Sequence, residues 1–131
     1  GGRMKLKIRI LLIFLAIIYI SFWAYEELRH ENIFEGILFL ITMIGAILNL
    51  TAMLANKGKM PVLDKNGNYE EQLKTDYCHC PINEKSRLTF LADIFEIKGI
   101  IMVSIGDILI SIPLIFFLII LAYYWIIYLL F

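Results

Sequence analysis

Three long apolar runs, separated by one short and one long polar segment, dominate the pattern of the chain. They cover residues 8–25, 33–55 and 108–131. Arg9 and Glu35, each near the start of its run, are the only charged residues in them. A helix needs about 20 apolar residues to cross the roughly 30 Å hydrocarbon core of a bilayer. The pattern therefore predicts an all-α membrane protein in which residues 1–131 form one membrane domain with three transmembrane helices.

The polar segments between the runs predict how these helices are connected. Residues 26–32 are too few to cross back over a bilayer, so the first two helices are expected to form an antiparallel hairpin. The second polar segment, residues 56–107, forms a loop before the C-terminal span. Because residues 99–131 are longer than one span requires, the last helix is expected to begin near Asp107. Ser104 or Asp107 would then cap its first turn, and residues 99–103 would lie at the membrane surface or in a short re-entrant dip.

A stripe of small and polar residues follows one face of the second span. Its members recur at steps of three, four or seven positions: Glu35, Thr42, Gly45, Asn49, Ala52 and Asn56. Helices in lipid pack through small residues and through polar side chains that bond across the contact. We interpret Thr42, Gly45, Asn49 and Ala52 as a helix-packing surface. The alternative is a solute path lined by Asn49 and Glu35, since polar groups in a membrane often mark such paths.

Composition and charge agree with a membrane protein. The chain has 60% hydrophobic and 18% charged residues and no net charge, so it has none of the basic excess that favours nucleic acid as a partner. Lys and Arg concentrate before residue 10 and in the long loop, whereas the short turn has Arg29 alone. The positive-inside rule then places the N-terminus and residues 56–107 in the cytoplasm and the C-terminus outside. The expected location is the inner (cytoplasmic) cell membrane, with the lipid bilayer as the first partner.

Within the long loop, three local patterns predict structure. Asp64 to Asn68 form a strong turn signal that is compatible with a short hairpin. Residues 70–75 are expected to form no more than a loose helical turn. Residues 87–97 have Leu88, Leu91, Ala92 and Phe95 at helical spacing, which predicts an amphipathic segment along the inner membrane interface.

The Cys78-His79-Cys80 cluster is a weak candidate for a metal site. Thiolates and imidazole are ligands of zinc and copper(I), but a closed tetrahedral site needs four ligands, and Cys pairs in zinc sites are spaced more widely. The only other histidine, His30, is expected on the opposite side of the membrane. We interpret the cluster as an ordinary loop, with a metal shared between chains as the alternative, and we expect no cofactor.

Four motifs of the second half carry a resemblance to a known family. In chain order they are Asn-Lys-Gly-Lys-Met-Pro-Val at 56–62, His79, Arg-Leu-Thr-Phe-Leu-Ala-Asp at 87–93, and Ser-Ile-Gly-Asp at 104–107. The chain thus resembles a small prokaryotic membrane-protein family known as domain of unknown function 5317. The first half is similar to that family only in its helices. The family's loop usually begins Asn-Gly-Gly-Arg-Met-Pro-Val, so Lys57 and Lys59 depart from its pattern.

The resemblance implies a binding constellation and supplies no activity. It implies that one cytoplasmic-side group contains Asn56, Met60, Pro61, Asp93 and Asp107. The Cys-His-Cys cluster is not among the family's motifs. The family also tends to have a further helix before a Gly-Gly-basic junction. Gly1-Gly2-Arg3 is therefore either the end of such a helix, a tag remnant, or the start of a processed chain.

Three functional hypotheses follow from the sequence. The favoured one is a non-catalytic membrane subunit or accessory protein that associates with other membrane-protein subunits or with itself, because three spans bury little core. The second is an ion or solute transport component that uses Asp107 and Asn49. The third is an interfacial membrane enzyme in which Asp93 and Asp107 act as a paired acid and base.

Overall fold

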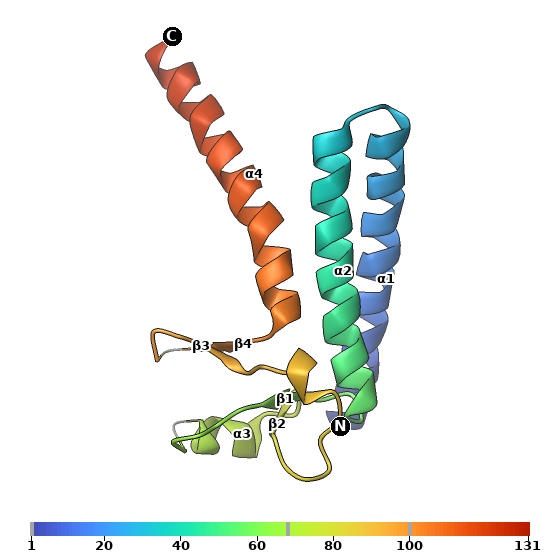
Figure 1. Ribbon diagram of the computed structural model, residues 1–131, viewed down its shortest axis with the longest axis vertical. Helices are drawn as coiled ribbons and strands as arrows, with labels where there is room; N and C mark the ends of the chain where they lie inside the picture. The colour runs from blue at the N-terminus through green and yellow to red at the C-terminus, as the bar shows by residue number, and fades with distance from the viewer. Residues whose placement is uncertain (1, 68, 100) are drawn as a thin grey trace.

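Three long helices and a small polar domain make up the protein (Figure 1). The computed structural model describes residues 2–67, 69–99 and 101–131. Within it, α1 (Gly2–Arg29), α2 (Ile33–Ala55) and α4 (Ile105–Leu130) are each long and apolar enough to cross a membrane. The predicted fold class is therefore confirmed. Gly1 of the Gly-Gly junction, Asn68 of the expected turn and Ile100 of the expected surface segment lie outside the described residues.

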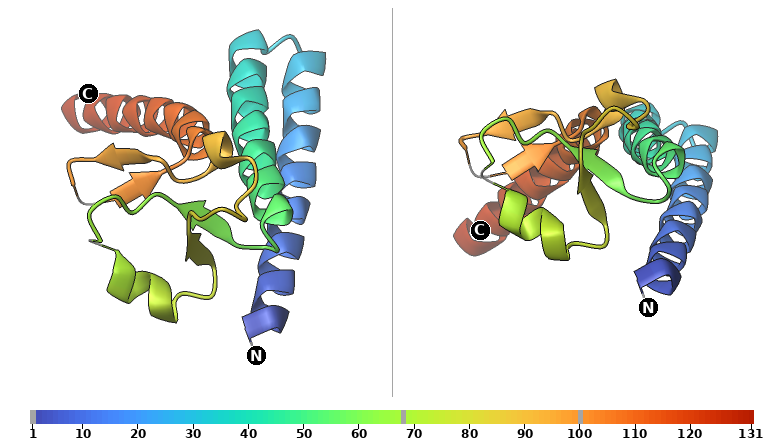
Figure 2. Two further views of the ribbon diagram at one scale, coloured as in Figure 1. Left: turned by 60° about the horizontal axis from the view of Figure 1, so that its bottom comes forward. Right: turned by 90° about the horizontal axis from the view of Figure 1, so that it is seen from below.

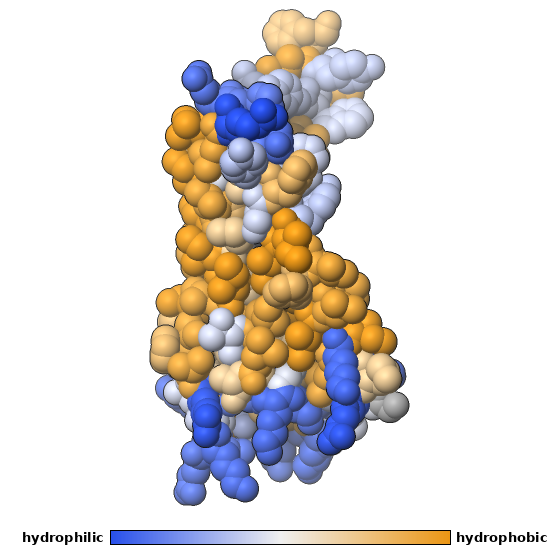
Figure 3. Space-filling model, turned by 90° about the vertical axis from the view of Figure 1, so that its right-hand side faces the viewer, coloured by the Kyte–Doolittle hydropathy of each residue, from blue (hydrophilic) through white to orange (hydrophobic). Residues whose placement is uncertain are grey.

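The first two helices run side by side as a hairpin (Figure 1). Gly36 allows the two helices to approach closely, because a Cβ there would overlap the side chain of Leu28. The Ser21 hydroxyl, which also bonds to a carbonyl of its own helix, lies 2.9 Å from the sulfur of Met43. Figure 3 shows apolar side chains over the middle of the molecule and hydrophilic ones towards both ends of the apolar zone, as expected for helices in a bilayer.

The third helix, α4, begins beside the middle of α2 and leans away from the hairpin (Figure 1). Gly45 of α2 and Gly106 of α4 lie in contact, since a Cβ on either would overlap backbone of the other helix. Aromatic contacts follow further along, with the rings of Phe34 and Phe116 5.8 Å apart. After Pro113, which is buried, every residue of α4 is exposed.

The segment between α2 and α4 forms what we call the connecting domain, residues 56–104. It lies at the same end of the hairpin as the N-terminus (Figures 1 and 2). Two short strands, β1 (Met60–Val62) and β2 (His79–Pro81), pair in parallel, with α3 (Glu70–Thr75) between them. The parallel pairing replaces the hairpin that the turn signal at residues 64–68 suggested, although Gly67 does adopt the positive φ of a turn.

The amphipathic helix expected at residues 87–97 is absent, which corrects that prediction. A 3-10 turn, η1 (Thr89–Leu91), is followed by β3 (Phe95–Ile97), which pairs antiparallel with β4 (Ile101–Val103). Leu91 and Ala92 are buried, whereas Leu88 and Phe95 are exposed, so the four apolar positions do not share one face. Alternation along β3 and β4 instead places Phe95, Ile97 and Ile101 on one exposed face.

A small apolar core joins the connecting domain to the hairpin. Ala52 and Met53 from the end of α2 pack with Met60 of β1 and Leu91 of η1. Ile10 and Ile13 of α1 and Leu48 of α2 pack against this cluster. The connecting domain is therefore fixed against the last turns of α2, which sets the position of the polar side chains described next.

Candidate functional site in the connecting domain

Asp93 occupies the centre of the connecting domain. Its backbone N–H donates to the carbonyl of Pro61 at 3.0 Å, and its carbonyl accepts from the N–H of Leu63 at 2.9 Å. All three residues of β1 are buried, so this pairing carries Asp93 into the interior. Asp93 is only 6% exposed, although carboxylates are rarely buried without a partner.

His79 lies between two carboxylates. Its Nδ1 is 2.7 Å from Asp76 Oδ2, and its Nε2 is 3.8 Å from Asp93 Oδ2. The other oxygen of Asp76 accepts from the backbone N–H groups of Cys78 at 2.7 Å and of His79 at 3.2 Å. This turn aligns the imidazole so that its far nitrogen faces Asp93.

The pKa values of the two carboxyl groups, Asp93 and Asp76, shift in opposite directions. Burial raises the pKa of Asp93 to about 6, and the carboxylate of Asp107 adds to the rise, while His79 and Arg9 oppose it. Burial would also raise the pKa of Asp76, but the hydrogen bonds from the Cys78 N–H and from His79 outweigh it and lower that pKa. Asp76 therefore acts as a fixed anion that orients His79, and Asp93 can gain or lose a proton near neutral pH.

A cavity of ≈ 250 Å³ contains this group. Its lining consists of Val62, Tyr69, Gln72, Leu73, Asp76, His79, Asp93, Ile101 and Met102. Two buried polar atoms, Asp93 Oδ1 and the Tyr69 hydroxyl, have no hydrogen-bond partner within the described part of the chain. Unsatisfied buried polar atoms are rare, and here they point to a bound molecule or water as their partner.

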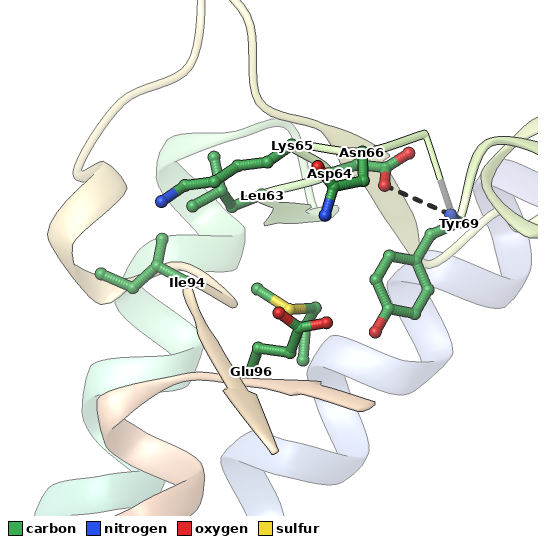
Figure 4. Close-up of a pocket in the computed structure, with 8 residues that line it drawn as sticks. Leu63, Asp64, Lys65, Asn66, Tyr69, Ile94 and Glu96 are labelled. Carbon is green, nitrogen blue, oxygen red and sulfur yellow. Dashed lines mark hydrogen bonds between the residues drawn. The ribbon is translucent and has the colours of Figure 1, made fainter. Parts of the chain in front are cut away.

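A smaller cavity of ≈ 90 Å³ adjoins the first, because Tyr69 and Met102 line both. Figure 4 shows the Tyr69 ring and the Glu96 carboxylate in this hollow, beside Asp64 and Asn66. The Asp64 carboxylate accepts from the backbone N–H of Tyr69 at 3.2 Å and so fixes the start of α3. The turn that the sequence predicted at Asp64 therefore positions Tyr69, which lines both cavities.

A second polar cluster fixes α4 to α2. Asp107 Oδ1 accepts from the Asn49 amide at 2.8 Å, and its Oδ2 accepts from the Ser104 N–H at 3.1 Å. The Ser104 hydroxyl donates to Asn49 Oδ1 at 2.6 Å and accepts from the Asp107 N–H at 3.1 Å. Ser104 and Asp107 thereby form a capping box, which confirms the expected cap and starts α4 before Asp107.

The structure brings part of the predicted constellation together. Pro61 bonds to the backbone of Asp93, Met60 packs with Leu91 two residues before it, and Asp107 is close enough to affect the pKa of Asp93. Asn56, in contrast, bonds to the backbone of Arg87, with its amide donating to the carbonyl at 2.9 Å and its oxygen accepting from the N–H at 2.8 Å. It therefore positions the loop around Arg87 rather than contacting Asp93.

The residues of the predicted packing surface divide into three groups. Gly45 and Asn49 contact α4, and Ala52 is fully buried against the connecting domain. Among the described residues, the Thr42 hydroxyl bonds only to the Leu38 carbonyl of its own helix. Glu35, near the opposite end of α2 from Asn49, is exposed and does not join Asn49 in a path.

The three residues Cys78, His79 and Cys80 do not converge on one point. Successive side chains of an extended segment point to opposite faces, and only His79 enters the ≈ 250 Å³ cavity. Within the described residues, no three His, Cys, Asp or Glu side chains are arranged to hold a metal ion. Both thiols are free, and burial raises the pKa of Cys80.

Sequence reasoning missed two members of the site, Asp76 and Tyr69. The Asp-x-x-His spacing of Asp76 and His79 was the available signal, because an aspartate at the start of a turn accepts from backbone N–H groups two and three residues later. Nothing in the sequence indicated that Tyr69, with a buried hydroxyl, would line the same cavity as Asp93.

Three apolar helices and a compact polar domain at one end define the chain as a small integral membrane protein. Residues 3–120 match the model of the family of unknown function DUF5317, and the chain therefore belongs to that family. This confirms the resemblance drawn from the four sequence motifs. No curated protein and no solved structure matches the chain.

Proposed function

We propose that this protein is a non-catalytic integral membrane subunit that works in contact with further membrane helices, from its own copies or from other subunits. The observation that carries the proposal is the exposure of α4. All residues from Leu114 to Phe131 are exposed, whereas the first turns of α4 are fixed to α2 by a complete hydrogen-bond network. Beyond the contacts of Phe116 and Phe117 with rings of α2, the helix is uncovered, which leaves room for another helix beside the hairpin.

Physical considerations favour a protein neighbour at this position. Helices in hydrocarbon associate through side-chain packing, and α4 leans away from the hairpin so that its residues beyond Phe117 are exposed (Figure 1). The end of α4 has a shallow groove of ≈ 570 Å³ lined by Leu121, Tyr124, Trp125, Ile127 and Tyr128. Aromatic side chains at such a groove offer large, rigid contact area to a neighbouring helix.

The distribution of charge supports an orientation with the connecting domain in the cytoplasm of a prokaryote. The basic residues before residue 10 lie at the same end of the hairpin as the connecting domain. In this orientation the Asp93 cavity faces the cytoplasmic side of the membrane, and the exposed half of α4 lies in the outer part of the bilayer.

The particle mass in native membranes tests the proposal. Patches of membrane are extracted with a styrene–maleic acid copolymer, and the protein content of each particle is measured by light scattering. The expected protein mass is at least twice the 15.2 kDa of one chain, or includes a co-purifying subunit. Particles that contain one 15.2 kDa chain and no other protein would overturn the proposal.

A second candidate function is acid–base catalysis at the membrane interface. It rests on the cavity in which Asp93 Oδ2 lies 3.8 Å from His79 Nε2 and Asp93 Oδ1 has no partner within the described residues, with Asp76 behind the imidazole. The pairing differs from the expected one of Asp93 with Asp107, because both oxygens of Asp107 already accept hydrogen bonds. The same engagement of Asp107 gives no support to a transport path through Asp107 and Asn49.

Turnover of a bacterial lipid extract by the purified protein tests this second candidate, with products followed by mass spectrometry. Asp93→Asn and His79→Gln are expected to abolish turnover. The control Asp64→Asn changes a carboxylate of the neighbouring hollow, outside the larger cavity, and is expected to retain it. Absence of turnover by the wild-type protein would remove this candidate.

A further inference from the structure

An open groove of ≈ 850 Å³ lies at the C-terminal end of α2, apart from the Asp93 cavity. Four basic side chains line it: Lys57, Lys59, Lys85 and Arg87. Glu84 is the only carboxylate in the lining. Within the described residues, none of the four cations lies within ion-pair distance of a carboxylate. The groove therefore carries an excess of positive charge, with four cations against one carboxylate that, in the described part of the chain, pairs with none of them.

The groove is preformed by hydrogen bonds. The side chain of Asn56 bonds to both the N–H and the carbonyl of Arg87 and so holds the basic loop against the end of α2. Within that loop, the Asn83 N–H donates to the Ser86 hydroxyl at 2.9 Å, and the Lys85 N–H donates to the Asn83 side chain at 2.8 Å. The four cations thus face one space without a large rearrangement of the loop.

The turn that ends α2 supplies the other wall. Lys57 and Gly58 both have positive φ, of 59° and 88°, and the Gly58 N–H donates to the Met53 carbonyl at 2.7 Å. This reversal of the chain directs it back under α2 and places Lys57 and Lys59 in the lining of the same groove.

An exposed apolar track leads from the groove along α2. Leu54 lines the groove and is 57% exposed, and Ile47 and Ile44 are 41% and 47% exposed. With the exposed Thr51, these positions recur at steps of three and four and therefore lie on one face of the helix. A cationic groove that continues into an apolar track along a membrane helix has the two-part chemistry of a lipid.

We propose that this groove binds an anionic phospholipid, with the headgroup phosphate on the four cations and an acyl chain along the track. Basic pockets beside membrane helices bind acidic headgroups through such clusters. Arg87 offers a planar set of donors to phosphate oxygens, and the three lysines add compact charges. A free phosphate or soluble phosphate ester would use the cations alone, whereas a phospholipid uses the track as well.

Spin-labelled lipids in nanodiscs test the proposal with the whole chain. Nanodiscs of phosphatidylcholine receive trace spin-labelled phosphatidylglycerol or phosphatidylcholine, and electron paramagnetic resonance measures the motionally restricted fraction of each. The groove variant is Lys85→Gln/Arg87→Gln. The matched control, Lys65→Gln/Lys98→Gln, removes two positive charges from connecting-domain residues that do not line the groove. Circular dichroism confirms that both variants keep the wild-type helix content.

The expected result is that wild-type protein and the control restrict phosphatidylglycerol preferentially, and that the groove variant lowers this preference about tenfold. An equal loss in both variants would show general electrostatic attraction and overturn the site. Absence of any preference in the wild-type protein would also overturn it. Displacement of the labelled lipid by millimolar sn-glycerol 3-phosphate would show that the groove takes a soluble anion, which contradicts the proposal as well.

Discussion

Exchanging Asn49 and Asp107, the two polar side chains that join α2 to α4, tests most sharply how the fold is stabilised. In Asn49→Asp, a second carboxylate replaces the amide whose nitrogen is 2.8 Å from Asp107 Oδ1. Two carboxylates about 4 Å apart, at an effective dielectric constant of about 20, repel by about 4 kcal/mol before relaxation. We therefore expect Asn49→Asp to lower the free energy of unfolding by about 2–4 kcal/mol.

In the double variant, Asp107→Asn is expected to restore the pairing of one carboxylate with one amide that Asn49→Asp removes. Asp107→Asn alone keeps a residue suited to a helix N-cap region and is expected to cost about 1 kcal/mol. The double variant Asn49→Asp/Asp107→Asn again joins one carboxylate to one amide. It should recover about 1–2 kcal/mol relative to the sum of the single effects. Thr42→Val, whose hydroxyl bonds only within α2, should change stability by less than about 0.5 kcal/mol.

Equilibrium unfolding in mixed micelles, followed by helix content, measures all four variants against the wild-type protein. The coupling free energy from the double-mutant cycle is the decisive quantity. If the double variant were no more stable than the sum of the single effects, the contact between Asn49 and Asp107 would not hold α4 in place.

Three further predictions concern the connecting domain. The pKa of Asp93 is raised from 3.8 to about 6, so its burial destabilises the folded protein by about 3 kcal/mol as pH rises from about 4 through 6. Asp93→Asn should remove this loss and unfold at higher denaturant than the wild-type protein at pH 7.5; an unchanged pH dependence would contradict it. Lys57 has a positive φ, a conformation that favours glycine, so Lys57→Gly should leave stability unchanged or raise it by about 1 kcal/mol. Gly58→Ala, at φ 88°, should lower the free energy of unfolding by about 1–2 kcal/mol in the same assay. Equal effects of Lys57→Gly and Gly58→Ala would contradict backbone strain at these two positions. The exposed apolar face of the β3–β4 pair, formed by Phe95, Ile97 and Ile101, is expected to contact lipid. In a Trp23→Phe/Trp125→Phe background, Phe95→Trp should therefore be quenched by brominated lipids more strongly than Glu96→Trp, which replaces a residue on the other face of β3; equal quenching would contradict this lipid contact.

The membrane architecture could be predicted because it depends on composition over long windows. Apolar runs of this length are compatible with few structures other than spanning helices, and Ser104 with Asp107 is a strong local signal for a helix start. The stripe on α2 indicated a contact surface because Gly45 and Asn49 interrupt a bulky sequence. Which helix would cover that surface depended on the path of the connecting domain, which local patterns do not specify.

The connecting domain was harder to predict because its elements are three to six residues long. Leu88, Leu91, Ala92 and Phe95 fit helical spacing, yet two of them are buried in tertiary contacts and the chain continues as a strand. Asp93 was singled out by the family motif, but its partners were not. Asp76, Tyr69 and His79 reach it only because β1 and β2 pair in parallel, a contact between distant segments.

The exposed half of α4 is the feature on which the proposed role depends, and site-specific photocrosslinking in intact membranes tests it most directly. Leu118 on α4 and Leu11 on α1 are both 55% exposed, so p-benzoylphenylalanine at each position gives a matched pair. We expect Leu118→p-benzoylphenylalanine to yield a protein adduct heavier than the 15.2 kDa chain, and the Leu11 variant to yield much less. If the Leu118 variant crosslinked to lipid alone, α4 would have no protein neighbour, and the role as a subunit would be contradicted.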